Sequence, residues 1–391
     1  MNDRGKASQR IEPPAWPAQI PALTSLRFVA AMLVVLLHYR ERMGMDWLAE
    51  SALFTRGYLA VDFFFVLSGF VLAHVYLNRL REGRYSHISF VERRLARIWP
   101  LHVATLAVVL AIYGAMTLAG FTPNNPDRYR LELLPANLFM LHAWGFHEEQ
   151  SFNYPSWSVS AEWFAYLLFP LFAGIALRLW RRPLALVALA LVALVALDFA
   201  TRSLGGWPLT RMTDYFGIWR IVPEFLLGVA TWRLGLSLSL GRAAALVMWL
   251  AIAALVALVA LGLSDLWLVP LFAVIIFTAA DATRHGGMGL GPLEKRRFVY
   301  LGDVSYAVYM VHVPIYTLWF NGWVVLLGAD TAARLALPIW ALSLPLVVAG
   351  AMIAHHLVEL PGKRWLLRLA PLTRLEAWLE KRFPGIAGGR S

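Results

Sequence analysis

The sequence predicts an all-α polytopic membrane protein with about ten transmembrane helices and both termini in the cytoplasm. Of its 391 residues, 59% are hydrophobic and only 15% are charged, and the mean hydropathy is positive. Such a composition is typical of a chain that crosses a membrane several times. Apolar stretches of about 20 residues, each long enough to span a bilayer, are expected at 22–40, 59–77, 98–119, 158–178, 184–201, 217–236, 243–263, 267–282, 303–326 and 335–357.

The charged residues predict the orientation of these spans. The net charge is +11, but the basic residues lie between the apolar stretches and form no separate domain, so no nucleic-acid partner is expected. Most of the 35 lysines and arginines fall in segments that share a side with the termini. The positive-inside rule places that side in the cytoplasm. The expected regions are a cytoplasmic segment 1–21, a membrane domain 22–357 and a cytoplasmic amphipathic tail 358–391, in the inner (cytoplasmic) membrane.

Two absences narrow the chemistry. The chain contains no cysteine, which excludes disulfides, thiolate metal sites and a cysteine nucleophile. Residues 1–21 are polar and rich in proline, so we expect no cleavable signal and a first span that is retained.

The first span, Leu23–Arg42, carries two ionisable residues, Arg27 and His38. They are eleven positions apart, which places them on one helix face, about 16 Å apart along the axis. Arg27 lies toward the cytoplasm and His38 toward the outer leaflet, so together they suggest a polar track through the bilayer. Alternatively, Arg27 snorkels to the inner interface and His38 sits at the opposite rim.

The second span contains Asp62 near its outer end and the pair Ser68-Gly69, which lets a helix or a ligand approach closely. Asp62 is either functional, or it pairs with a nearby arginine or caps the helix. At the cytoplasmic start of the third span stand Arg93, Arg94 and Arg97, and the last two share a face. Guanidinium groups bind phosphates well, so this cluster suits a phosphate-bearing cytosolic donor. Basic residues at a span end are also ordinary topology markers.

The outer segment 120–157 contains an apolar piece, Leu131–Trp144, which is too short to span. It is expected to be re-entrant, to cover a site as a lid, or to be a structural amphipathic helix. Beyond the last span, Lys363–Phe383 alternates basic and apolar residues and predicts an interfacial helix on the anionic inner leaflet.

The fourth span opens with the sequence PSWSVSAEWFAY, in which Ser156 or Ser158 is positioned to cap the helix. Glu162 then lies inside the membrane, with Tyr166 on the same face. An intramembrane carboxylate is a functional candidate. By topology it enters from the same side as His38 and Asp62, which suits acid–base work on a hydroxyl.

The ninth span carries Ser305, Tyr309, His312 and Tyr316 at helical spacing, which predicts either a cavity lining or a hydrogen-bonded core. His355 and Glu359 have metal-compatible spacing, but no third ligand accompanies them, so no metal site is expected. The candidate substrate and cavity residues are therefore Asp62, Ser68, Trp157, Ser158, Tyr166, Tyr309 and His312.

The ordered set of motifs resembles the acyltransferase 3 family of integral membrane acyltransferases. The matching stretches are Arg27-x10-His38, GYLAVDFFFVLSGF, the Arg-x-x-Arg of Arg94 and Arg97, PSWSVSAEWFAY, LGDVSYAVYMVHVP and Glu359-Leu360-Pro361. They extend over about residues 20–365. Ala60 stands where the family commonly has glycine, a change expected to affect helix packing only.

The resemblance implies transfer of an acyl group, in the first place acetyl, from cytosolic acyl-CoA to a hydroxyl of an envelope or extracellular glycan. Arg94, Arg97 and Arg93 would bind acetyl-CoA, and Arg27 would guide it. His38 would be the general base or carry the acyl group, with Glu162 and Asp62 orienting it or binding the acceptor. The expected partners are acyl-CoA, a glycan or lipid-linked sugar, the lipid bilayer and, in a relay, a separate extracytoplasmic acyl-accepting protein.

Two alternatives stay open at this point. One is a proton-coupled transporter or flippase of a sugar or lipid-linked sugar, whose buried His, Arg and Glu would conduct protons. The other is an acyltransferase with a lipid or natural-product acceptor.

Overall fold

A computed structural model describes residues 15–122, 125–146, 148–370, 372–375 and 378. Over these residues the chain is helical and contains no strand. The principal helices are α1 (Pro21–Tyr39), α4 (Ala60–Leu72), α6 (His87–Leu118), α8 (Trp157–Leu167), α9 (Phe169–Arg178), α10 (Pro183–Gly205), α11 (Gly217–Gly235), α12 (Ala244–Ala260), α13 (Val269–Arg284), α14 (Arg296–Leu327) and α16 (Ala336–Ala354). The all-α prediction is confirmed.

Eight helical segments in the described part of the chain are long and apolar enough to cross a membrane. They are Pro21–Arg42, Ala52–Arg81, His87–Leu118, Pro183–Gly205, Gly241–Ala260, Asp265–Arg284, Arg296–Leu327 and Ala336–Leu375. Two further helical stretches, Tyr154–Leu167 and Phe169–Arg178, meet at a bend of 54°. If this bent pair counts as one span, the described residues contain up to nine candidate spans. The protein is thus a multi-pass membrane protein, whereas the count of ten and the orientation of the termini stay predictions.

The remaining expected span, 217–236, corresponds to α11, which is almost wholly buried. Its buried residues include the charged Arg220 and Glu224. These charges lower the mean hydropathy of α11, which is therefore not among the eight candidate spans. Because neighbouring helices surround it, α11 can carry polar side chains that a lipid-exposed helix cannot.

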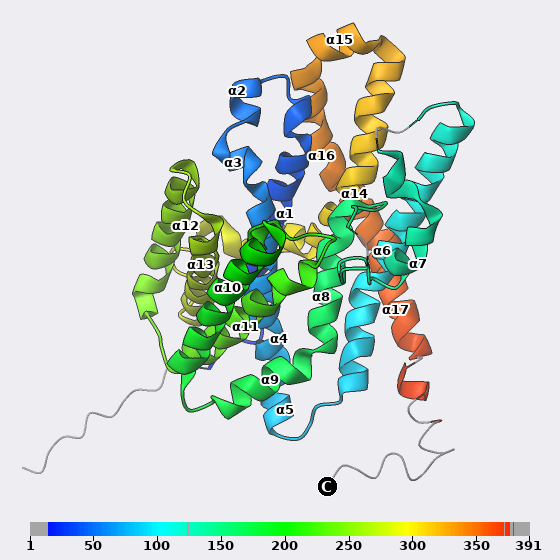
Figure 1. Ribbon diagram of the computed structural model, residues 1–391. Coiled ribbons are helices and arrows are strands. Elements are labelled where there is room, and N and C mark those ends of the chain that lie inside the picture. Colours follow the sequence, from blue (N-terminus) through cyan, green and yellow to red (C-terminus); the bar gives the residue numbers. More distant parts are fainter. Residues whose placement is uncertain (1–14, 123–124, 147, 371, 376–377, 379–391) are drawn as a thin grey trace, which may run out of the picture.

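Short helices mark the two ends of the bundle (Figure 1). At one end lie α5 (Asn78–Arg81), the end of α9 and α17 (Leu360–Leu369). At the other end lie α2 (Asp46–Ala49), α3 (Ala52–Thr55) and α15 (Ala329–Arg334). The first end contains the basic segments that the sequence analysis assigned to the cytoplasm, so we call it the basic end and the other the opposite end.

Glycine contacts set the closest helix crossings. A Cβ on Gly69 of α4 would overlap the carbonyl oxygen of Phe225 in α11, and a Cβ on Gly228 would overlap that of Val66. In the same way, Gly302 of α14 lies against the carbonyl of Thr24 in α1. Small residues therefore let these backbones touch, as predicted for the Ser68-Gly69 pair.

The segment Leu131–Trp144 forms two short turns, a 3₁₀ turn (Leu131–Leu133) and α7 (Leu134–Leu138), instead of one amphipathic helix. The Trp99 indole donates to the Leu138 carbonyl at 3.1 Å. Ser160 of α8 donates to the Met140 carbonyl at 2.8 Å. These bonds hold the segment against α6 and α8 as a structural part of the fold.

Two local expectations change. Ser156 is the N-cap residue of α8, but neither its side chain nor that of Ser158 caps the helix. The Ser156 hydroxyl instead bonds His142 Nε2 at 3.1 Å, and Ser158 turns to Pro155 and Tyr309. Of the predicted interfacial tail, α17 and residues 372–375 and 378 are helical, and the rest lies outside the described residues, as does 1–14.

We expect Gly69→Ala to destabilise the protein, because the new methyl group must push α4 away from backbone atoms of α11. Overpacking of this kind costs about 1–3 kcal/mol. The measurement is the thermal unfolding midpoint in detergent. Gly174→Ala in α9, where a Cβ meets nothing, is the matched control. Equal midpoints for both variants would contradict the close crossing.

Candidate active site

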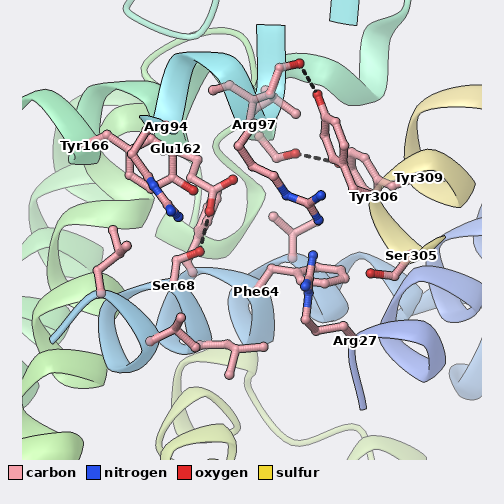
Figure 2. Close-up of a pocket in the computed structure, with 18 residues that line it drawn as sticks. Arg27, Phe64, Ser68, Arg94, Arg97, Glu162, Tyr166, Ser305, Tyr306 and Tyr309 are labelled. Atoms are coloured by element: carbon pink, nitrogen blue, oxygen red, sulfur yellow. Dashed lines mark hydrogen bonds between the residues drawn. The ribbon is translucent and has the colours of Figure 1, made fainter. Parts of the chain in front are cut away.

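A cavity of about 160 Å³ lies among five helices, α1, α4, α6, α8 and α14 (Figure 2). Its lining combines apolar side chains of α4 with polar groups from the other four helices. The lining residues are Arg27, Val61, Phe64, Phe65, Leu67, Ser68, Val71, Leu72, Arg94, Arg97, Ile98, Ser158, Val159, Glu162, Tyr166, Ser305, Tyr306 and Tyr309. Residues far apart in the sequence thus share one chamber.

The cavity is electrically positive. Among its lining residues, Arg27, Arg94 and Arg97 carry positive charge and Glu162 carries negative charge. Figure 2 shows the guanidinium groups of Arg27 and Arg97 pointing toward each other from opposite walls. Like charges gathered in a low-dielectric site attract an anionic ligand strongly.

Arg97 is the arginine of this set that has a carboxylate partner. It forms an ion pair with Glu359, which is 1% exposed. On its other oxygen Glu359 bonds His355 Nδ1 at 2.9 Å. The His355–Glu359 spacing, first considered as a metal pair, therefore positions Arg97. The described ranges contain no group of three side chains able to hold a metal ion.

Arg27 and Arg94 make no hydrogen bond or ion pair with any described residue. Arg94 lies over the rings of Tyr76 and Tyr166, at 5.9 and 5.8 Å from their centroids. Both guanidinium groups thus keep their donors for a ligand. Arg93, by contrast, is exposed and does not line the cavity.

Glu162 faces this cavity and receives a hydrogen bond from the Ser68 hydroxyl. Tyr166, one helical turn further, lines the same wall and is buried. Ser68, Glu162 and Tyr166 are therefore brought together with the arginines, as the sequence analysis expected for a polar cavity.

Asp62 pairs with an arginine, which was one of the roles expected for it. Its two oxygens accept from Arg220 Nε at 2.8 Å and Nη2 at 2.6 Å, and both side chains are buried. Trp157 lies under the Arg220 guanidinium, 5.2 Å from it, and does not line the cavity. The alternative that Asp62 pairs with a nearby arginine is confirmed. In the described part of the chain, no hydrogen bond or ion pair links Asp62 or Glu162 to His38, so the convergence of these groups stays a prediction.

His38 pairs with another histidine. Its Nδ1 lies 2.9 Å from Nε2 of His312, and His312 Nδ1 lies 2.6 Å from the Tyr309 carbonyl oxygen. The Tyr309 hydroxyl bonds Ser158 at 2.7 Å, and both residues line the cavity. His38 and His312 do not line the cavity, but His312 is linked to it through Tyr309 on α14.

On the far side of His38 lies Tyr154, with ring centroids 5.2 Å apart, and the Arg128 guanidinium covers Tyr154 at 4.7 Å. These two residues come from the segment that connects α6 to α8. His38 therefore contacts Tyr154 from the 120–157 segment as well as His312, and the polar track along α1 stays a prediction.

Two further residues contribute to the site, Lys363 and Tyr306, neither of which was expected from the sequence. Lys363 of α17 lies within electrostatic range of Arg94, Arg97 and Glu359, because Gly362 packs against Pro100 of α6. Tyr306 lines the cavity and donates to the Ile98 carbonyl at 2.6 Å. Lys363 was expected only as part of the interfacial helix 363–383. The spacing of Tyr306 relative to Tyr309 was the available signal for Tyr306.

Comparison with known proteins identifies the chain. The family model described as "Acyltransferase domain" matches residues 20–366, and the chain belongs to this family. It is 29% identical to acyltransferase MdmB of Streptomyces mycarofaciens over 387 residues, which cover 90% of this chain and 94% of that protein. It is 26% identical to O-acetyltransferase OatA of Staphylococcus aureus over 203 residues, 49% of this chain and 31% of OatA. No solved structure matches.

The Asp62–Arg220 pair predicts a structural phenotype. Asp62→Ala leaves a buried guanidinium without its partner, which costs about 3–5 kcal/mol, and we expect little folded protein. Replacing both residues, as in Asp62→Leu with Arg220→Met, removes both charges and should restore much of the loss. The measurement is the folded fraction by size-exclusion chromatography in detergent. Failure of the double variant to recover any folded protein would contradict a mainly structural role.

Proposed function

We propose that this multi-pass membrane acyltransferase moves an acyl group, in the first place acetyl, from cytosolic acyl-CoA to a hydroxyl of an envelope glycan. The observation that carries the proposal is the gathering of Arg27, Arg94 and Arg97 around one cavity whose wall includes Tyr309, the residue that binds His312, the partner of His38. The setting would be the cytoplasmic membrane, where donor and acceptor come from opposite sides.

The donor side rests on charge and position. Coenzyme A carries phosphates, and guanidinium groups bind phosphate oxygens in pairs. Arg94 has no ion-pair partner among the described residues, and Lys363 stands nearby on α17, at the basic end. We assign Arg94 and Lys363 to the phosphates of acyl-CoA. Arg97 and Arg27 also line the cavity that the donor would enter. The charge of Arg97 is partly offset by Glu359.

The acceptor side rests on His38. As the acceptor oxygen attacks the thioester carbonyl, His38 takes the hydroxyl proton, the carbon–sulfur bond breaks, and the leaving thiolate receives that proton. In a two-step route His38 itself would first carry the acyl group and then pass it to the hydroxyl. Both routes use the same nitrogen of the His38 ring. Glu162, bonded to Ser68 in the cavity, would help to orient Arg27 or the bound donor.

The acceptor class follows from the family resemblance and the predicted topology. The similarity to OatA, an O-acetyltransferase, supports an acetyl donor and a hydroxyl acceptor. A glycan or lipid-linked sugar reaching His38 from the opposite end fits the placement of Tyr154 and Arg128 beside it. Transfer through a separate extracytoplasmic protein would use the same exit.

The test of transfer uses inside-out membrane vesicles that contain the native glycan and either the parent protein or His38→Ala, at equal folded levels. Acetyl-labelled acetyl-CoA is supplied, and base-labile label on the glycan is counted. We expect label with the parent and a loss of at least about 100-fold with His38→Ala, since general base catalysis contributes that much or more. Equal label from both proteins would remove His38 from the reaction.

The absence of label from both proteins would contradict the proposed donor, acetyl-CoA, or the proposed acceptor, the envelope glycan. Uptake of a sugar driven by a proton gradient, without any effect of acetyl-CoA, would then favour a transporter. Label recovered in a lipid or natural-product fraction would keep the enzyme class and change the acceptor.

The donor site makes a separate prediction. Arg94→Ala and Lys363→Ala should each weaken acetyl-CoA binding by about 10-fold or more, because each removes one charge-assisted phosphate contact of about 1.5–3 kcal/mol. The measurement is equilibrium binding to the purified protein in detergent. Arg364→Ala, an exposed neighbour on α17, is the matched control. Equal affinity in all four proteins would overturn the assignment.

A further inference from the structure

The histidine pair allows the tautomer of each ring to be deduced. A backbone carbonyl only accepts hydrogen bonds, so His312 Nδ1, 2.6 Å from the Tyr309 oxygen, must carry a hydrogen. Neutral His312 then has a bare Nε2, which accepts from His38 Nδ1 at 2.9 Å. Neutral His38 accordingly carries its hydrogen on Nδ1, and its Nε2 presents a lone pair.

The ring geometry supports this deduction. The two ring centroids are 5.0 Å apart and the planes differ by 19°, while the bonded nitrogens are only 2.9 Å apart. The nitrogens therefore lie between the centroids, so the rings meet edge to edge in nearly one plane. An in-plane approach directs the hydrogen of one ring at the lone pair of the other, which is the favourable geometry.

His312 is also held firmly in place. It is fully buried, and its backbone carbonyl accepts from the Tyr39 hydroxyl at 2.7 Å, which ties it to the residue next to His38. Pro314 has no amide hydrogen, so the Met310 carbonyl lacks its usual helical partner and accepts from Asn153 at 3.0 Å. These contacts fix the part of α14 that presents His312 to α1.

We propose that His312 is the positioning residue for His38: it selects the tautomer whose Nε2 faces the reacting groups and supports the positive charge that develops there. The proposal rests on the proposed function. When His38 Nε2 takes the acceptor proton, the Nδ1 hydrogen bond to His312 strengthens, and the ring cannot turn away. A carboxylate performs this task in a serine protease triad.

A neutral partner suits the surroundings. No carboxylate bonds His38 among the described residues, and the polar groups that act on it are His312, Arg40, Arg128 and the Val34 backbone. The second histidine orients the first without placing an additional ion inside the membrane domain, where an unpaired charge would be costly.

The test compares His312→Leu, which removes the acceptor, with His312→Gln, whose side-chain oxygen can accept from His38. His102→Gln is the control, since His102 is equally buried and bonds the Asn137 carbonyl outside the cavity lining. We expect kcat of folded His312→Leu to fall by about 100-fold or more with KM for acetyl-CoA unchanged. His312→Gln should recover at least about tenfold of that loss, and His102→Gln should match the parent.

A second measurement is independent of turnover. Nitrogen-15 NMR of histidine-labelled protein should show His38 protonated on Nδ1 in the parent and in His312→Gln, and a mixture of tautomers in His312→Leu. A parent His38 protonated on Nε2, or an unchanged tautomer in His312→Leu, would overturn the inference. A parent without transferase activity but with the expected tautomers would contradict the proposed function alone.

Discussion

A charged side chain inside a membrane-embedded bundle needs an oppositely charged or hydrogen-bonding partner. The rest of this structure depends on which buried charges have such a partner. Asp62 neutralises Arg220 between α4 and α11, and Glu359 neutralises Arg97 beside the cavity. Arg27 and Arg94 have neither an ion pair nor a hydrogen bond within the described chain, although they face the same chamber. Because unpaired buried cations are costly, their presence in one cavity is best understood as a site that a ligand completes.

One helix connects the two halves of the proposed reaction. Tyr309 and His312 of α14 are three residues apart and so share a face. Tyr309 contributes to the cavity wall, while His312 holds His38 on α1. The close α1–α14 crossing at Gly302 brings the two helices together. This helix thus links the cavity lining to the His38–His312 pair.

Much of the architecture could be predicted from the chain. Long apolar stretches indicated the helices, and charges between them indicated which loops belong together, because bilayer thickness and charge transfer act on local sequence. Motif order indicated the family. The pair Ser68-Gly69 was correctly expected to permit close approach, with Gly69 facing α11 and Ser68 facing Glu162.

Partner choice among buried polar residues was not predictable in this way. Local spacing specified that Arg27 and His38 share a face, that Glu162 lies within the membrane and that His355 and Glu359 are one turn apart. It did not specify that Asp62 would bind Arg220, that Glu359 would bind Arg97, or that His38 would bind His312. Those partners lie more than 150 residues apart in the sequence. A hydrogen bond needs two atoms within about 3 Å, and only the packing of the helices brings such residues together.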